Sequence, residues 1–122
     1  MARQRLPDER LSITHKFIVG RGSSEEVEGF VTVGLYDDGR PGEMFVTLAK
    51  KGSALGAVVD CWAWAVSLLL QHGVLLEDII HKAQGWHFEP AGFTSNPQIP
   101  VARSVIDYIA RWLAMRFQDE PA

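Results

Sequence analysis

The chain is nearly devoid of cysteine: Cys61 is the only one among 122 residues. A single thiol forms no disulfide within the chain and builds no cysteine-ligated zinc site. Cys61 falls in an apolar segment, so we expect a buried side chain whose thiolate form is disfavoured. A lone thiol is typical of a reducing compartment, and we expect the protein to be cytoplasmic.

The sequence also lacks an excess of positive charge and a long uninterrupted apolar run. Its formal net charge is −3 and its pI is about 5.7, which argues against binding to DNA. The N-terminus has no apolar stretch of the kind found in signal peptides. Residues 54–70 are slightly short for a bilayer and include Asp60, so we expect no membrane association.

Alternating side chains predict β-strands in the first half of the chain. In residues 12–19, one face carries the side chains of odd-numbered positions, including His15 and Phe17. Turn-forming residues at 37–42 reverse the chain later on. We expect an antiparallel meander, with one face covered, made of strands 12–19, 27–36 and 44–48.

Three helices are expected in the second half. Residues 54–71 follow a plausible N-cap at Ser53 and end near Gly73. This helix is apolar on all sides, so it needs cover from more than the sheet, and we therefore expect a homo-oligomer. Helices at 76–83 and 100–117 complete an α+β fold. In the last helix we expect one stripe to face the core (Ala102, Val105, Ile106, Ile109 and Leu113) and another to face water (Arg103, Asp107 and Arg111).

The flanks of this fold differ in composition from its centre. Residues 1–11 are polar and contain Pro7, which favours an extended N-terminal arm available to clasp a partner. A single α+β domain is expected over residues 12–117, followed by a polar tail at 118–122.

Two segments are candidates for a phosphate or nucleotide site. Lysines that open a helix bring charge and free N–H groups together, although the glycine framework of a P-loop is missing. A simple helix cap with solvated lysines remains the alternative. In the irregular loop at 86–96, the aromatic rings would stack on a nucleobase or would only pack into the core. The candidates are Lys50, Lys51, Gly52 and Ser53 at the helix, Trp86, His87, Phe93, Thr94, Ser95 and Asn96 in the loop, and Arg40 and Arg103 as further anion contacts.

The histidines do not predict a metal site. His81, His87 and Glu89 lie near one another, and residues 87–89 are similar to the start of a zinc-deaminase signature. That signature needs two later cysteines, which this sequence lacks. We expect no bound metal.

Three stretches, RLPDERLSITHKF (5–17), GLYDDGRPGEMFVTLAKKGS (34–53) and FEPAGFTSNPQIPVARSVIDYIARW (88–112), occur in a distinctive order. In that order the chain resembles the TSCPD-type C-terminal accessory domain of adenosylcobalamin-dependent, class II ribonucleotide reductases. Asn96 stands where the Thr-Ser-Cys-Pro motif has cysteine, so no redox or metal role of that cysteine carries over. The resemblance implies an α+β accessory fold and an association with deoxynucleotide synthesis.

The resemblance does not imply catalysis by this chain. Ribonucleotide reduction in that family needs several thiols and a barrel that uses adenosylcobalamin, whereas this chain has one cysteine and is too short for a barrel. We expect no cofactor on this chain and no enzyme activity of its own. Its expected function is that of a non-catalytic module that oligomerises and binds a nucleotide or a reductase partner. The alternative is an independent oligomer, for example phage-encoded, that sequesters a nucleotide or a nucleotide-like signal.

Overall fold

The computed structural model describes residues 2–49 and 53–118. Its main sheet has three antiparallel strands in the order β1 (Ser12–Val19), β2 (Val27–Leu35) and β3 (Pro41–Leu48). The chain continues through α1 (Ala54–Gln71) and α2 (Leu76–Ala83), then the short strands β4 (Gly92–Phe93) and β5 (Val101–Ala102), to α3 (Val105–Phe117). These elements confirm the predicted α+β class and the three-stranded meander.

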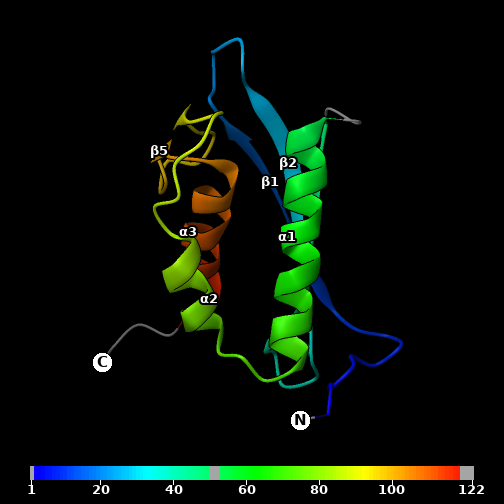
Figure 1. Ribbon diagram of the computed structural model, residues 1–122. Coiled ribbons are helices and arrows are strands. Elements are labelled where there is room, and N and C mark those ends of the chain that lie inside the picture. The colour runs from blue at the N-terminus through cyan, green and yellow to red at the C-terminus, as the bar shows by residue number, and fades with distance from the viewer. Residues whose placement is uncertain (1, 50–52, 119–122) are drawn as a thin grey trace.

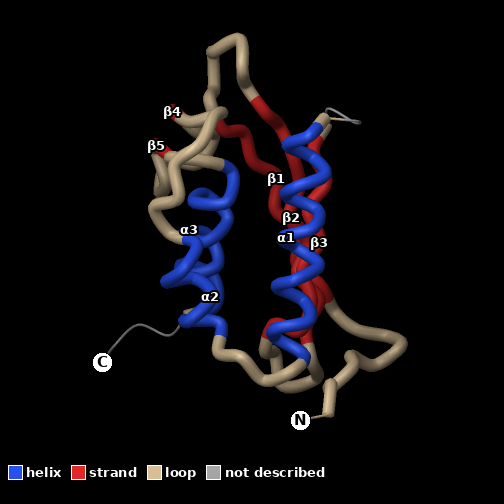
Figure 2. The backbone as a smooth tube through the Cα atoms, viewed as in Figure 1, coloured by secondary structure: helices blue, strands red, loops and turns tan. Residues whose placement is uncertain are grey.

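The helices lie over one face of the sheet (Figures 1 and 2). In the register of the strands, His15 faces Val31, and Val31 faces Val46 on the same side. α1 runs along β3, while α2 packs on α3. The buried core between the layers contains Phe17, Val31, Val33, Met44, Val59, Val66, Tyr108 and Ile109.

Two strand boundaries differ from the prediction. β2 ends at Leu35 and β3 already begins at Pro41, because the pairing continues past a register shift between Gly34 and Leu35. The bulge keeps Pro41 opposite Leu35, so part of the predicted turn belongs to the ladder.

The last helix begins later than predicted. Val101–Ala102 pairs with Gly92–Phe93 as a two-stranded sheet, so the chain is extended where the helix was expected to start. The Ser104 hydroxyl then accepts the N–H of Asp107 at 2.9 Å and caps α3. Asp107 is buried, contrary to the prediction that it faces water, because its carboxylate accepts the N–H groups of Gly85 and Arg103.

The N-terminal segment lies against its own domain. The N–H of Gln4 donates to the carbonyl of Gln71 at 2.8 Å, and the carbonyl of Gln4 accepts the Tyr36 hydroxyl at 2.6 Å. Arg3 also donates to the Gln71 side chain. These bonds hold the segment at the end of α1 (Figure 1).

α1 is confirmed, with Ser53 accepting the N–H of Gly56 as its cap. By length and composition alone it is also long enough and apolar enough to cross a membrane. Its buried apolar residues form a narrow stripe of Val59, Ala63 and Val66 that lies against the sheet. Leu55, Trp62 and Leu70 are partly buried beside this stripe, whereas Val58, Trp64 and Leu69 stay exposed in the described part of the chain.

Candidate functional site

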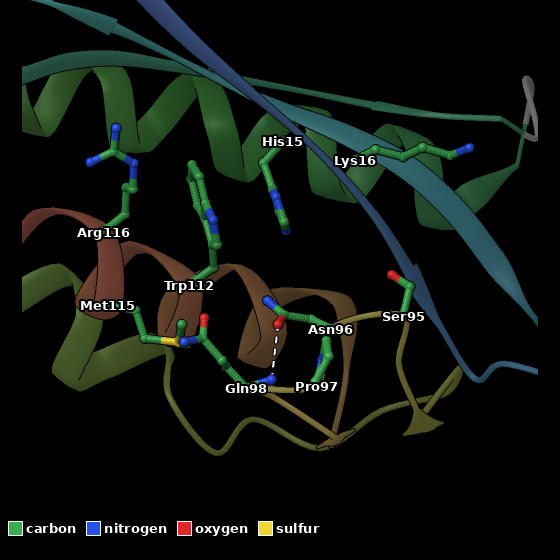
Figure 3. A pocket seen from close by; sticks show the side chains of 9 residues that line it. All are labelled: His15, Lys16, Ser95, Asn96, Pro97, Gln98, Trp112, Met115 and Arg116. Atoms are coloured by element: carbon green, nitrogen blue, oxygen red, sulfur yellow. Dashed lines mark hydrogen bonds between the residues drawn. The ribbon is translucent and has the colours of Figure 1, made fainter.

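A cavity of about 490 Å³ lies where β1, the loop after α2 and the C-terminal half of α3 meet (Figure 3). A cavity of this size falls within the range of small-molecule sites. Each of the three elements contributes side chains, so the site exists only in the folded domain. Its lining consists of His15, Lys16, Ser95, Asn96, Pro97, Gln98, Trp112, Met115 and Arg116.

The loop segment 94–99 is a rigid turn. The Thr94 hydroxyl donates to the Ile99 carbonyl, and it accepts the N–H of Asn96 at 3.0 Å. The side-chain oxygen of Asn96 accepts the N–H of Gln98 at 2.9 Å, which is an Asx-type turn. Ile99 is buried and anchors the turn in the core. The backbone of this loop and the side chains of Thr94 and Asn96 therefore have defined positions.

The same turn is joined directly to β1. The N–H of Ser95 donates to the carbonyl of Ile18 at 3.2 Å, and the N–H of Ile18 donates to the Ser95 hydroxyl at 3.0 Å. Val19 and Thr94 form an isolated antiparallel bridge. The loop is thus held against the strand that carries His15.

Tyr108 is the centre of the polar network beneath the cavity. Its hydroxyl lies 2.8 Å from Nε2 of His15 and 3.1 Å from Nδ2 of Asn96. Because the Asn96 oxygen faces the N–H of Gln98, its NH₂ group must donate to Tyr108. The Tyr108 proton is then available to donate to Nε2 of a neutral His15. This arrangement leaves the Nδ1–H of His15 as a further donor on a ring that lines the cavity.

Aromatic packing keeps the His15 ring in place. The ring stacks on Trp112 with centroids 4.9 Å apart and planes 9° from parallel. Burial lowers the pKa of the His15 imidazole below its usual value, which favours the neutral form. Burial also raises the pKa of the Tyr108 phenol, with the hydrogen bond from Asn96 opposing this shift. The network is therefore neutral and rich in donors near pH 7.

The two cations of the lining differ in their availability. Lys16 pairs with Glu28 at 3.1 Å, and in Figure 3 its side chain extends away from the other labelled side chains. Arg116 lies beside Trp112 at the other end, is exposed, and has no ion pair among the residues described. Arg116 is accordingly the cation best able to meet an anionic ligand.

The structure brings together only part of the predicted loop site. Ser95 and Asn96 line the cavity, and Thr94 supports them from beneath. Phe93 is exposed and lines a second hollow with Arg21, which Thr94, Ser95 and Asn96 also border. Trp86 lies instead between α1 and α2, where it bonds to the Lys82 carbonyl.

The other predicted positions lie apart from this cavity. His87 and Arg103 are exposed and do not line it, and Arg103 instead binds Asp107 through its backbone. Arg40 is in the β2–β3 turn, at the opposite end of the sheet, paired with Asp38 at 2.7 Å. Of the predicted phosphate site, residues 50–52 (Lys50, Lys51 and Gly52) lie outside the described residues, and Ser53 caps α1.

Sequence reasoning missed the contributions of β1 and α3. His15 was placed on the same strand face as Phe17, and a polar ring among the apolar side chains of that face was the available signal. Trp112 and Arg116 gave no signal, because their approach to His15 depends on how α3 packs on the sheet.

Neither a metal site nor a buried thiol is present in the described part of the chain. No group of three or more potential metal-ligating side chains occurs there. Cys61 is exposed, so the prediction of a buried thiol is wrong. The reason is the narrow contact of α1, which buries Val59 and Ala63 but leaves Cys61 on the flank of the helix.

The TSCPD domain family matches residues 3–117. A vitamin B12-dependent ribonucleotide reductase of Rhodopirellula baltica is 52% identical over 115 residues, which are 94% of this chain and 11% of that protein. The reductases of Streptantibioticus cattleyicolor and Bradyrhizobium diazoefficiens are 43% and 40% identical, over 94% of this chain and 18% and 9% of theirs.

The match thus covers almost all of this chain but less than a fifth of the length of each reductase. No solved structure matches it. The family match covers the strands, the loop and all three helices of the described structure. The chain therefore belongs to the TSCPD domain family.

Proposed function

We propose that this chain is a non-catalytic accessory module of deoxynucleotide synthesis that binds a nucleotide in the cavity between β1, residues 95–98 and α3. The names of its relatives support the metabolic setting, since the matched reductases are vitamin B12-dependent enzymes acting on ribonucleotides. This chain corresponds to a small part of them and contains one cysteine. In this proposal cobalamin belongs to the reductase body.

The observation that carries the proposal is the orientation of the network around Tyr108. Asn96 donates to the Tyr108 oxygen, which lets the tyrosine donate to His15 and leaves Nδ1–H on the imidazole. Together with the Ser95 hydroxyl and the Arg116 guanidinium, this makes the cavity rich in hydrogen-bond donors. Phosphate oxygens only accept hydrogen bonds, and they fit such a lining.

The Gln98 side chain extends this donor set toward a base. Its amide both donates and accepts, and it lines the same cavity as Arg116. In the proposed complex the phosphates lie near Arg116 and the base edge meets the amide of Gln98. The volume of about 490 Å³ accommodates a mononucleotide.

Calorimetric titration of the chain with ribonucleoside and deoxyribonucleoside triphosphates tests this proposal. We expect saturable binding that Arg116→Glu weakens by at least about tenfold, since it replaces an attraction with a repulsion. Arg103→Glu is the matched control, because Arg103 is an exposed arginine that does not line the cavity. The absence of binding, or equal effects of the two variants, would falsify the proposed site.

The same cavity would also serve the alternative, an independent oligomer that sequesters a nucleotide-like signal. The two functions differ in the partner. Adding a B12-dependent reductase that lacks its own TSCPD region separates them: the accessory module changes the activity or nucleotide response of that enzyme, and the independent binder leaves both unaltered. A reductase that shows no response leaves the calorimetric test of the cavity unaffected.

A further inference from the structure

An apolar groove of about 490 Å³ lies between α1 and α2, separate from the cavity at β1. Figure 1 shows α1 standing apart from the α2–α3 pair over the sheet. Its walls come from both helices and its floor includes Ile106, which was expected to face the core and is only partly buried. The lining includes the apolar side chains of Val58, Trp62, Leu69, Ile79, Trp86 and Ile106.

The groove leaves a large apolar area open. Val58 is 58% exposed and Trp86 is 62% exposed, and Leu69 is 42% exposed. A second copy facing the groove would cover these side chains.

We propose that a second copy of this chain covers the groove, in an isologous dimer in which α2 lies antiparallel to the α2 of the other copy. The observation that selects a second copy is the charge pattern at the rim of the groove. Asp78 and Lys82 both line it, one helical turn apart. Neither has an ion-pair partner among the residues that the structure describes.

Two-fold symmetry makes this charge pattern self-complementary. When α2 meets its own copy in antiparallel orientation, Asp78 of each chain faces Lys82 of the other, and the pair forms twice. A partner with a different spacing of charges would not pair with both Asp78 and Lys82. The dimer also gives a location to the homo-oligomer expected from the apolar sequence of α1.

Trp86 is suited to anchor the contact. Its indole N–H donates to the Lys82 carbonyl at 2.5 Å, so the ring has a fixed orientation although it is largely exposed. A ring held in this way loses little conformational entropy when it becomes buried. In the dimer each Trp86 packs into the groove of the other copy, next to the Asp78–Lys82 pair.

Sedimentation velocity of the full chain over a concentration series tests the proposal. We expect a dimer whose dissociation constant rises at least about 30-fold in Trp86→Ala, as for an interface anchor. Trp64→Ala is the matched control, because Trp64 is 66% exposed on the other flank of α1 and does not line the groove. A dimer that Trp64→Ala weakens and Trp86→Ala does not would overturn the proposal.

Charge exchange provides a second readout that folding defects cannot imitate. Asp78→Lys alone and Lys82→Asp alone each place like charges opposite one another in a homodimer, and we expect both to be monomers at concentrations where the unaltered chain is dimeric. Mixed in equal amounts, the two variants should form a heterodimer, which native mass spectrometry resolves by mass.

Three other results would overturn the proposal: that the unaltered chain stays monomeric throughout the concentration series, that the mixed variants fail to associate, or that the chain partitions into lipid vesicles through the groove. Monomers that instead bind a reductase lacking its TSCPD region would assign the groove to that partner. None of these measurements uses a nucleotide, so the dimer and the nucleotide site can each fail without the other.

Discussion

The hydroxyl of Tyr108 lies 2.8 Å from Nε2 of His15, although 93 residues separate the two in the chain. The same hydroxyl accepts from Asn96 at 3.1 Å. One oxygen atom therefore connects β1, the loop and α3, so the stability of the fold and the shape of the candidate site depend on the same contacts.

Removing that oxygen tests this dependence. We expect Tyr108→Phe to lower the free energy of unfolding by about 1–3 kcal/mol, because two polar groups lose their partner in a partly buried site. The aromatic packing on Phe17 is retained. Urea denaturation measures the change. Tyr36→Phe removes one hydroxyl bonded to the Gln4 carbonyl and should cost less; a larger loss there would contradict the central position of Tyr108.

The lowered pKa of His15 predicts a dependence of stability on pH. Above about pH 6.5 the imidazole is neutral in both the folded and the unfolded chain, so its contribution to stability is fully present. As the pH falls below this value, the unfolded chain takes up a proton that the folded chain resists, and stability falls until the pH passes the lower folded pKa.

Urea denaturation at a series of pH values between 7.5 and 5 measures this effect. These pH values bracket the ordinary histidine pKa of about 6.5. His15→Asn is the comparison, since it removes the titrating ring and should flatten the stability profile in this window. An identical slope in the two proteins would assign the pH dependence to other groups.

Asp107 connects the start of α3 to the end of α2. Its carboxylate accepts the N–H of Gly85 at 2.7 Å and the N–H of Arg103 at 2.9 Å. Asp107→Asn turns an NH₂ group toward one of these donors, and we expect it to lower the free energy of unfolding by about 1.5–3 kcal/mol. Amide hydrogen exchange at Gly85 and Arg103 should accelerate. Glu77→Gln, on the exposed start of α2, should lower the free energy of unfolding by less and leave the exchange at Gly85 and Arg103 unaltered.

Gly29 is required by the close packing of β1, β2 and β3. A Cβ at this position would lie 2.8 Å from the Thr47 carbonyl oxygen and 2.9 Å from the Phe17 ring. Because the Thr47 oxygen is backbone, it has little room to move, and we expect Gly29→Ala to cost about 1–3 kcal/mol. Thermal unfolding measures the loss. Thr47→Ala, whose side chain is exposed, is the control and should cost less.

Strand alternation and helix composition predicted most of the fold, because each element has a local period. The shared strand face of His15 and Phe17, the helix cap at Ser53 and the extents of α1 and α2 all follow from patterns within a few residues. These patterns were sufficient for the meander and for the α+β class.

Local sequence patterns could not predict the contacts between distant segments. Asp107 was placed toward water because a carboxylate in an amphipathic helix usually lies there, yet two backbone N–H groups satisfy it in the interior. Trp86 and Asn96 were grouped by their common loop, although the chain directs them to different cavities. The site itself depends on the packing of α3 against β1, which no local period encodes.

The attachment of Ser95 to Ile18 has a consequence for solubility. β1 is an outer strand of the sheet, and the loop occupies part of its free edge through both hydrogen bonds between these two residues. An uncovered edge is a template for pairing with a strand of another molecule. The segment 94–96 therefore also shields the sheet from aggregation, so that even substitutions there that spare the cavity affect whether the protein remains dispersed.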